Sequence, residues 1–319
     1  MSKDIQKKVT DKILNLMKTG QFVWSKEWSG EIKMRLPKNG LTNQVYKGVN
    51  FWNLAIESQE RGFLTGEWVT FCQLQDLSKR YDKQLKIKKG SKGESVIFYK
   101  LLKNTKEDEK TKELKTLEIP LMKYSTVFNL SQVEGLEFEI LEKNNIKNTF
   151  NDDFNIDLGR LDFKFENAAQ MRACYGSTND IILLPMREQF KNSSAFYATV
   201  FHELIHWTGH ESRLNRKLGN AKDSKDYAFE ELIAEFGASF LCAQYGIDYE
   251  TQHAAYLKSW LNVLENDETL LFKAIAQAQK AADFVLNKLT VDEELEAARE
   301  NLTENEINEI LKNNNHYVT

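Results

Sequence analysis

Cysteine and proline are scarce in this sequence, with three of each among its 319 residues. The cysteines, Cys72, Cys174 and Cys242, are odd in number and far apart, which argues against a disulfide framework and favours a reducing compartment. We expect all three to be small core or boundary residues, because a free thiol is usually buried. No Gly/Ser-rich or Pro-rich linker is visible either.

Long apolar runs are also missing. The four-residue run at 181–184 is typical of the longest, whereas a membrane-spanning helix needs about 20 apolar residues. The first four residues lack the apolar core of a signal peptide. With 41% apolar and 28% charged residues, the composition suits a soluble globular protein. We therefore expect a cytoplasmic, intracellular protein without membrane contact, long enough for two domains.

The net charge of −4 hides an asymmetry between the two halves. Residues 1–130 carry 25 Lys and Arg against 15 Asp and Glu, a net charge of +10, and residues 131–319 carry a net charge of −14. A basic half joined to an acidic half indicates that the first half meets a polyanion. A solvated lysine-rich surface is the alternative for the lysines alone.

The helical signals of the first half are local and clear. Apolar periodicity predicts helices over residues 3–19 and 54–61, and Thr70 is a plausible N-cap for a third helix that reaches residue 80. With the strands described next, these helices predict an α+β domain over residues 1–135.

The strand signals of the first half lie after residue 80. A β-hairpin is expected over residues 84–100, because two apolar segments flank a turn that contains glycine. Residues 121–130 are expected to form a strand, and the polar segment 104–115 an exposed loop or a hairpin tip.

Four of the six tryptophans lie in the first 70 residues. They are Trp24, Trp28, Trp52 and Trp68, and lysines are interleaved with them. This pattern suits single-stranded nucleic acid, whose bases stack on aromatic rings while lysines meet the phosphates. The alternative for each ring is the hydrophobic core, because a domain of this size needs large apolar side chains.

A second domain is expected over residues 151–319, after a polar, acidic linker at 136–150. The apolar run at 181–184, ended by Pro185, predicts a buried edge strand, and such a strand could pair with an extended substrate. Helices are expected over residues 255–264 and 270–289, and the acidic segment 290–319 is expected to be a loosely docked helical tail.

The strongest signal is the motif H-E-x-x-H at residues 202–206. Phe196, Val200, Leu204 and Trp207 form one apolar face of a helix that Gly209 is placed to end. On that helix His202 and His206 lie one turn apart, where both can bind one Zn²⁺, and Glu203 beside them can act as general base.

Catalytic zinc normally has three protein ligands and a water. His210 is two turns from His202, about 12 Å along a straight helix, so it could bind the same ion only after a sharp turn. The better candidate is Glu231, which shares one face of a second predicted helix with Glu235. We assign Glu231 as the third ligand and Glu235 as the acceptor that orients an imidazole N–H, although a solvated face is the alternative for paired glutamates.

With one zinc ion per chain held in this way, Glu203 would take a proton from the attacking water and deliver it to the leaving amine. An additional donor could stabilise the oxyanion, and the candidates are His210, Tyr227 and Arg213. A metallopeptidase with an unknown protein substrate is therefore predicted. The alternative is a non-enzymatic protein with a structural or vestigial zinc site.

Motifs along nearly the whole chain resemble the ArdC-type antirestriction proteins and related zincin-like metallopeptidases of mobile elements. In the second half the resemblance rests on residues 184–190, 202–210, 213–216 and 227–235. In the first half it rests on residues 37–40, 46–50, 68–71, 89–93 and 127–129.

The resemblance implies an N-terminal domain that binds single-stranded DNA, a gluzincin-like C-terminal domain that is mostly helical with a small sheet, and a role in protecting incoming DNA. We take as candidate DNA-contacting residues Trp24, Lys38, Asn39, Tyr46, Asn50, Trp52, Lys88, Lys89 and Lys92.

Overall fold

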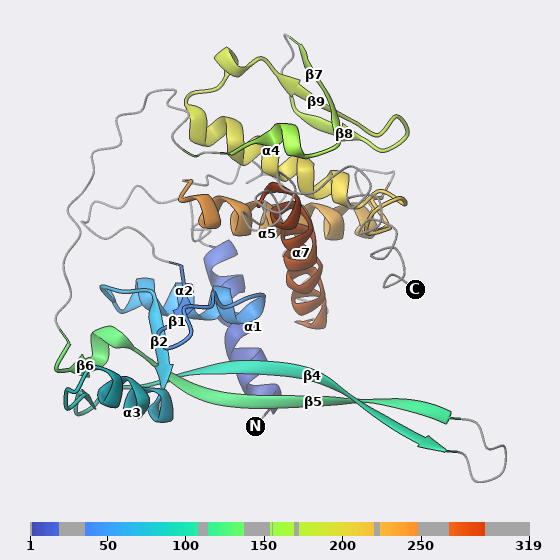
Figure 1. Ribbon diagram of the computed structural model, residues 1–319. Coiled ribbons are helices and arrows are strands. Elements are labelled where there is room, and N and C mark those ends of the chain that lie inside the picture. Colours follow the sequence, from blue (N-terminus) through green and yellow to red (C-terminus); the bar gives the residue numbers. More distant parts are fainter. Residues whose placement is uncertain are drawn as a thin grey trace, which may run out of the picture.

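The computed structural model describes residues 2–18, 36–107, 114–136, 154, 156–168, 172–219, 224–247 and 268–290 (Figure 1). Several predictions concern residues outside these ranges: Trp24, Trp28, nearly all of the linker at 136–150, the helix at 255–264 and the tail after residue 290. In the described ranges, no helix is both long enough and apolar enough to cross a membrane.

The first half of the chain is an α+β unit. Its helices are α1 (Ser2–Lys18), α2 (Val49–Glu60) and α3 (Phe71–Arg80). A four-stranded sheet with the order β1-β2-β5-β4 contains β1 (Lys38–Asn39), β2 (Glu67–Thr70), β5 (Leu114–Asn129) and β4 (Glu94–Glu107). A two-stranded sheet pairs β3 (Lys86–Ile87) with β6 (Val133–Glu134), which follows the short 3-10 helix Leu130–Gln132.

The second half is mainly helical. Its sheet has the order β7-β9-β8, with β7 (Lys164–Ala168), β9 (Ile181–Pro185) and β8 (Cys174–Gly176). Short 3-10 helices span Leu158–Arg160 and Arg187–Gln189. The long helices are α4 (Ser193–Thr208), α5 (Lys225–Tyr245) and α7 (Glu268–Leu289). The α+β class predicted from the sequence is confirmed.

Helix boundaries follow local chemistry. Thr70 caps α3 through a reciprocal capping box with Gln73, as the sequence predicts. The N-cap of α4 is Asn192, whose side chain accepts a hydrogen bond from the backbone N–H of Ala195. Helix α5 ends at Gly246, which has a φ of 64° and so adopts the left-handed conformation that glycine tolerates.

The predicted hairpin over residues 84–100 is wrong. Strand β3 pairs with β6, and β4 pairs in antiparallel register with β5, from Glu94 opposite Val127 to Glu107 opposite Leu114. The turn signal at 88–93 is real, but the partner of β4 is a longer apolar strand that lies further along the chain. Of the two alternatives for residues 104–115, a hairpin tip fits better than a loop, because β4 and β5 extend into this segment from both sides.

The predicted edge position of the strand at 181–185 is also wrong. Strand β9 is the central strand: β7 pairs with it in parallel and β8 in antiparallel register. Both edges of β9 are thus hydrogen-bonded within the sheet, so this strand cannot take up an extended substrate by strand addition. Its continuous apolar sequence reflects this central position.

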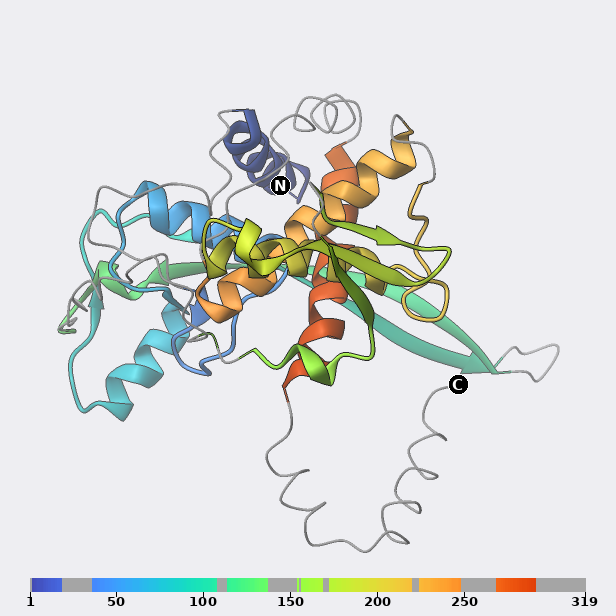
Figure 2. The same cartoon turned by 90° about the horizontal axis from the view of Figure 1, so that it is seen from above.

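The four-stranded sheet has an inner face, covered by α2, and an outer face. Trp68, Val96 and Val127 point from the inner face into a cluster with Tyr46 and Leu54. On the outer face α3 covers the β2 end through Val69, and the hairpin β4–β5 projects past the helices in both views (Figures 1 and 2).

The two halves share one hydrophobic core. The ring of Trp52 on α2 lies 5.2 Å from that of Phe236 on α5, and Phe51 lies 5.1 Å from Phe240. At the edge of this contact the Lys47 ammonium lies 2.9 Å from the Asp283 carboxylate on α7. Helix α2 therefore joins the basic half to the helix on which Glu231 and Glu235 lie.

Candidate metal centre

Helices α4 and α5 bring three candidate ligands together. The Nε2 atoms of His202 and His206 lie 3.2 Å apart, and each lies 3.6 Å from an oxygen of Glu231. Ligand atoms about 2.0–2.2 Å from one tetrahedral ion lie about 3.3–3.6 Å from one another. Two imidazole nitrogens and one carboxylate, whose two oxygens each lie 3.6 Å from a different imidazole, can surround a single divalent ion. Among the described residues this is the one group of such side chains that could hold a metal.

The close approach of the two helices depends on Gly237. A Cβ atom added there would lie 2.7 Å from Cδ1 and Cγ1 of Ile205, which is on the motif helix between the two histidines. The sequence predicts close packing at this point, because Ala234, Gly237 and Ala238 are small. Because glycine has no side chain, Ile205 can pack directly against the backbone of α5 at Gly237.

A carboxylate orients His206. Its Nδ1 atom lies 3.3 Å from Oε1 of Glu230, and Arg216 donates from Nε to Oε2 of the same carboxylate at 2.9 Å and from a terminal nitrogen to Oε1 at 2.7 Å. Arg216 also donates to the carbonyl of Ile205 at 2.7 Å. Sequence reasoning missed both Glu230 and Arg216, although they lie within motifs that it singled out at 213–216 and 227–235.

Negative charge from the glutamates surrounds the candidate ligands. Burial lowers the pKa of His206, but the hydrogen bond to Glu230 and the charges of nearby glutamates outweigh it and raise the pKa to about 9. Burial raises the pKa of Glu231, but the hydrogen bond from His202, the two imidazoles and a hydrogen bond from Tyr227 outweigh it and lower the pKa to about 2. Glu231 is therefore ionised at neutral pH, as a ligand must be.

The remaining predicted groups surround the ligands to different degrees. Glu203 is buried on α4, and its charge is among those that raise the pKa of His206. Oε1 of Glu235, which is fully buried, lies 3.8 Å from Nδ1 of His202. That distance exceeds hydrogen-bond length. Glu235 therefore lies further from the imidazole of His202 than Glu230 lies from the imidazole of His206.

His210 and Arg213 lie in the loop after α4. Nδ1 of His210 lies 2.8 Å from the Ser212 hydroxyl. The guanidinium of Arg213 binds the Asp180 carboxylate and lies 4.1 Å from the centre of the Trp207 ring. Arg213 is therefore committed to a structural contact, and Tyr227 donates a hydrogen bond to Glu231.

The candidate DNA-contacting residues divide into two sets. Trp52, with 1% of its surface exposed, packs against Phe236, so the prediction that it stacks on a base is corrected and its core alternative holds. Tyr46 is buried, and Asn50 exchanges two hydrogen bonds with the backbone of Ile97, which ties α2 to β4.

The other candidates lie at or near the surface. Asn39 caps its own turn by accepting from the backbone of Leu41, and Lys38 lies 3.3 Å from Glu67. Lys88, Lys89 and Lys92 are exposed on the segment that leads into β4, although Lys88 donates to the carbonyl of Ser131.

Comparison with protein families finds one match in each half of the chain. Residues 159–277 match a zincin-like metallopeptidase family, and residues 3–128 match the N-terminal domain of the anti-restriction factor ArdC. The fold and the site thus define a zincin-like domain that follows an ArdC-type N-terminal domain.

The same arrangement occurs in solved structures. The metal-free crystal structure of the antirestriction protein ArdC from plasmid R388 is 34% identical, with a TM-score of 0.71, and the match covers 90% of this chain and 98% of that one. The Mn(II)-bound structure is 33% identical, with a TM-score of 0.70, and covers 90% and 99%. The chain belongs to the family of ArdC antirestriction proteins.

Curated relatives include two DNA primases TraC of Escherichia coli, 35% identical over 295 residues and 33% identical over 301 residues. These matches cover 87% and 90% of this chain but only 19% and 27% of the primases, so the chain spans about a quarter or less of their length. The uncharacterized protein y4eC of Sinorhizobium fredii (strain NBRC 101917 / NGR234) is 28% identical over 292 residues, 88% of this chain and 91% of that protein.

Proposed function

We propose that this protein is a zinc-dependent metallopeptidase, with one zinc ion per chain, that also binds single-stranded DNA. The observation that carries the peptidase is the arrangement of His202, His206 and Glu231 around one ion position, with Glu203 on the same helix. A site that only stabilised the fold would need no general base beside its ligands.

Zinc bound there would supply a Lewis acid that polarises a carbonyl and lowers the pKa of water. The carboxylate of Glu203 accepts a proton from the attacking water and returns it to the nitrogen of the leaving amine. Glu230 and Arg216 hold the His206 ring in place, so that Nε2 points toward Glu231. Tyr227, at the start of α5, is a donor for the oxyanion.

The DNA-binding part of the proposal rests on the basic first half and its match to the ArdC N-terminal domain. A positive surface and exposed aromatic rings suit a single strand better than a duplex, because unpaired bases present their faces for stacking. Like the plasmid protein, this protein would protect incoming DNA from restriction. It would act in the cytoplasm on a host protein that meets that DNA.

Two substitutions separate the enzyme from a protein with a structural or vestigial zinc site. His202→Ala should lose the zinc that the purified wild-type chain carries, as measured by atomic absorption. Glu203→Gln should keep the metal but lose cleavage of host proteins, as measured by comparing the proteome of cells that produce each form. Glu211→Gln, an exposed glutamate in the following loop, is the matched control. Protection of DNA that survives Glu203→Gln unchanged would reject the peptidase as the mode of action.

A further inference from the structure

Three segments of the first half meet on one sheet. Residues 68–71, 89–93 and 127–129 are far apart in sequence, but β2 pairs with β5 and β5 with β4, so that Val69, Phe128 and Gly93 lie side by side. Burial in the inner face accounts for Trp68, Val127 and Asn129. It does not account for Phe71, Lys89, Lys92, Gly93 and Phe128.

Alternation along the strands places the unexplained residues on the outer face. Phe128 and Thr126 on β5 point away from the buried Val127, and Ser95 and Ile97 on β4 point away from the buried Val96. These outward side chains are half-buried or exposed, whereas Val96 and Val127 on the inner face are fully buried. In the part of the chain that the structure describes, α3 covers only the β2 end of this face (Figure 1).

Gly93 makes this face flat and aromatic. A Cβ atom there would lie 2.4 Å from the Thr126 methyl and 3.0 Å from two atoms of the Phe128 ring. The ring therefore lies close to the bare backbone of the glycine, next to the methyl group of Thr126. Phe71, 58% exposed, follows Thr70 where the chain leaves the sheet and is a second ring at this edge.

The charged side chains of the segment before β4 are all of one sign. Lys89 and Lys92 are exposed on the segment before β4, and two hydrogen bonds to the Lys92 carbonyl, from Arg61 and Gln132, fix its backbone. Residues 88–93 contain no Asp or Glu, and neither do the outward positions of β4 and β5 from 93 to 97 and from 124 to 128. Aromatic rings beside exposed lysines fit a chain of stacked bases and phosphates.

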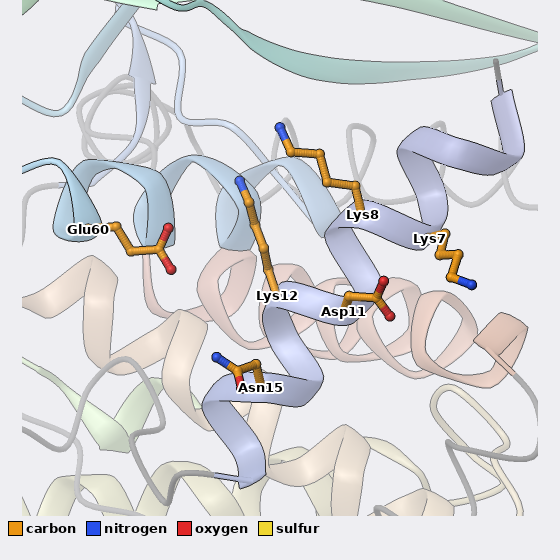
Figure 3. Close-up of a pocket in the computed structure, with 6 residues that line it drawn as sticks. All are labelled: Lys7, Lys8, Asp11, Lys12, Asn15 and Glu60. Carbon is orange, nitrogen blue, oxygen red and sulfur yellow. The ribbon is translucent and has the colours of Figure 1, made fainter.

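The cleft between α1 and α2 does not fit a polyanion, although three lysines line it (Figure 3). Lys8 lies 3.0 Å from Glu94, and Lys12 pairs with both Glu57 and Glu94. The acidic partners balance these cations, and Asp11 and Glu60 add negative charge at the rim. Residues 88–93 and the outward positions of β4 and β5 contribute no such acidic partner.

We propose that the outer face of the sheet binds single-stranded DNA, with Phe71 and Phe128 as stacking platforms and Lys89 and Lys92 as phosphate contacts. This inference rests on the DNA binding proposed above and specifies its surface. The bound DNA then lies on the side of the sheet opposite α2. It is therefore away from the helices that carry the candidate metal ligands (Figure 1).

The test is the affinity of the full-length protein for a fluorescein-labelled 20-nucleotide oligo-dT, measured by fluorescence anisotropy. Phe71→Leu and Phe128→Leu should each weaken binding by about 5- to 150-fold, the range that corresponds to the loss of one stacked base. The double substitution of Lys89 and Lys92 by Gln should reduce the slope of log affinity against log salt by about 1.4, at about 0.7 per phosphate contact.

Phe98 and Lys123 provide matched controls, because they lie opposite each other in register on the inner-face side of the same two strands and both are exposed. Phe98→Leu and Lys123→Gln should bind as the wild type does. Equal weakening by the control pair, or unchanged binding after Phe71→Leu, would overturn the proposed surface.

Other outcomes distinguish this inference from the broader proposal. A wild-type protein that binds no oligonucleotide would reject DNA binding itself, and tighter binding to the matched duplex would reject a single-stranded ligand. Phe71 is so exposed that its substitution leaves the core intact, so that variant decides the question even if Phe128→Leu does not fold.

Discussion

Arg216 holds Glu230 through two hydrogen bonds, at 2.9 and 2.7 Å, and both side chains are almost fully buried. The same carboxylate faces His206, so a residue in the loop after α4 positions a metal ligand through α5. This pair joins the two helices that carry the candidate ligands, although neither residue belongs to the group of three.

Replacing Arg216 with Gln should leave the Glu230 carboxylate buried without its guanidinium. Breaking such a pair costs about 3–5 kcal/mol of stability, and loss of the group that supports a ligand lowers metal affinity by about 10- to 100-fold. Thermal unfolding and titration of zinc against a competing chelator measure the two effects. Lys217→Gln, at the exposed neighbouring position, is the control and should change neither.

For Gly237→Ala, the sign of the change in the free energy of unfolding tests the close contact between α4 and α5. Alanine has the higher helix propensity, by about 1 kcal/mol, so a substitution without steric overlap would stabilise α5. Because a Cβ atom would lie 2.7 Å from Ile205, we expect a loss of about 1–3 kcal/mol instead, measured by urea denaturation. The double variant with Ile205→Val should recover part of that loss. A more stable Gly237→Ala protein would contradict the close contact.

Glu94 makes the stability of the protein depend on pH in the acidic range. Burial raises the pKa of Glu94, but the charge of Lys12 and the hydrogen bond from Lys8 outweigh it and hold the pKa below its usual 4.5. Its contribution to stability is therefore complete above pH 4.5 and is lost as the pH falls through the lower folded-state value. The difference in the free energy of unfolding between wild type and Glu94→Gln, from urea curves, should shrink as the pH falls below 4.5. A difference that stays constant down to pH 2.5 would show that Glu94 is not the group that titrates.

Trp52 should couple the unfolding of the two halves. Its ring packs against Phe236 on α5, so Trp52→Ala should cost about 3–5 kcal/mol, as for other buried aromatic side chains. Calorimetry should give one transition in the wild type and a lower transition temperature in the variant, with a smaller decrease for Trp52→Phe. Two separate wild-type transitions would mean that the shared core does not unite the halves.

The grouping of the candidate ligands could largely be predicted because its signals are local. Two histidines at i and i+4 on one helix, and two glutamates at i and i+4 on another, identify faces that must point inward. Glu230 could not be assigned in this way, since its partners, His206 and Arg216, depend on how the loop after α4 approaches α5. No spacing rule in the sequence encodes that approach.

The sheets could be predicted less well because strand pairing is a long-range choice. The turn at 88–93 suggested a hairpin, but β4 pairs with a strand that begins at residue 114. Similarly, the apolar run at 181–184 indicates a buried strand, and only the positions of β7 and β8 make it central. The tryptophans show the same limit, since composition alone does not tell a core ring such as Trp52 from an exposed one.

The position of α2 has a consequence for what the protein could reach while it is attached to DNA. Helix α2 lies between the sheet and the helices that carry the metal ligands, and its Trp52 fixes the spacing (Figure 1). Single-stranded DNA bound to the outer face would leave the metal centre open to a second molecule. A protein cleaved at the metal centre would then lie beside the bound DNA and would not compete with it for one surface. An added oligonucleotide should therefore neither protect that protein from cleavage nor keep a chelator from the metal.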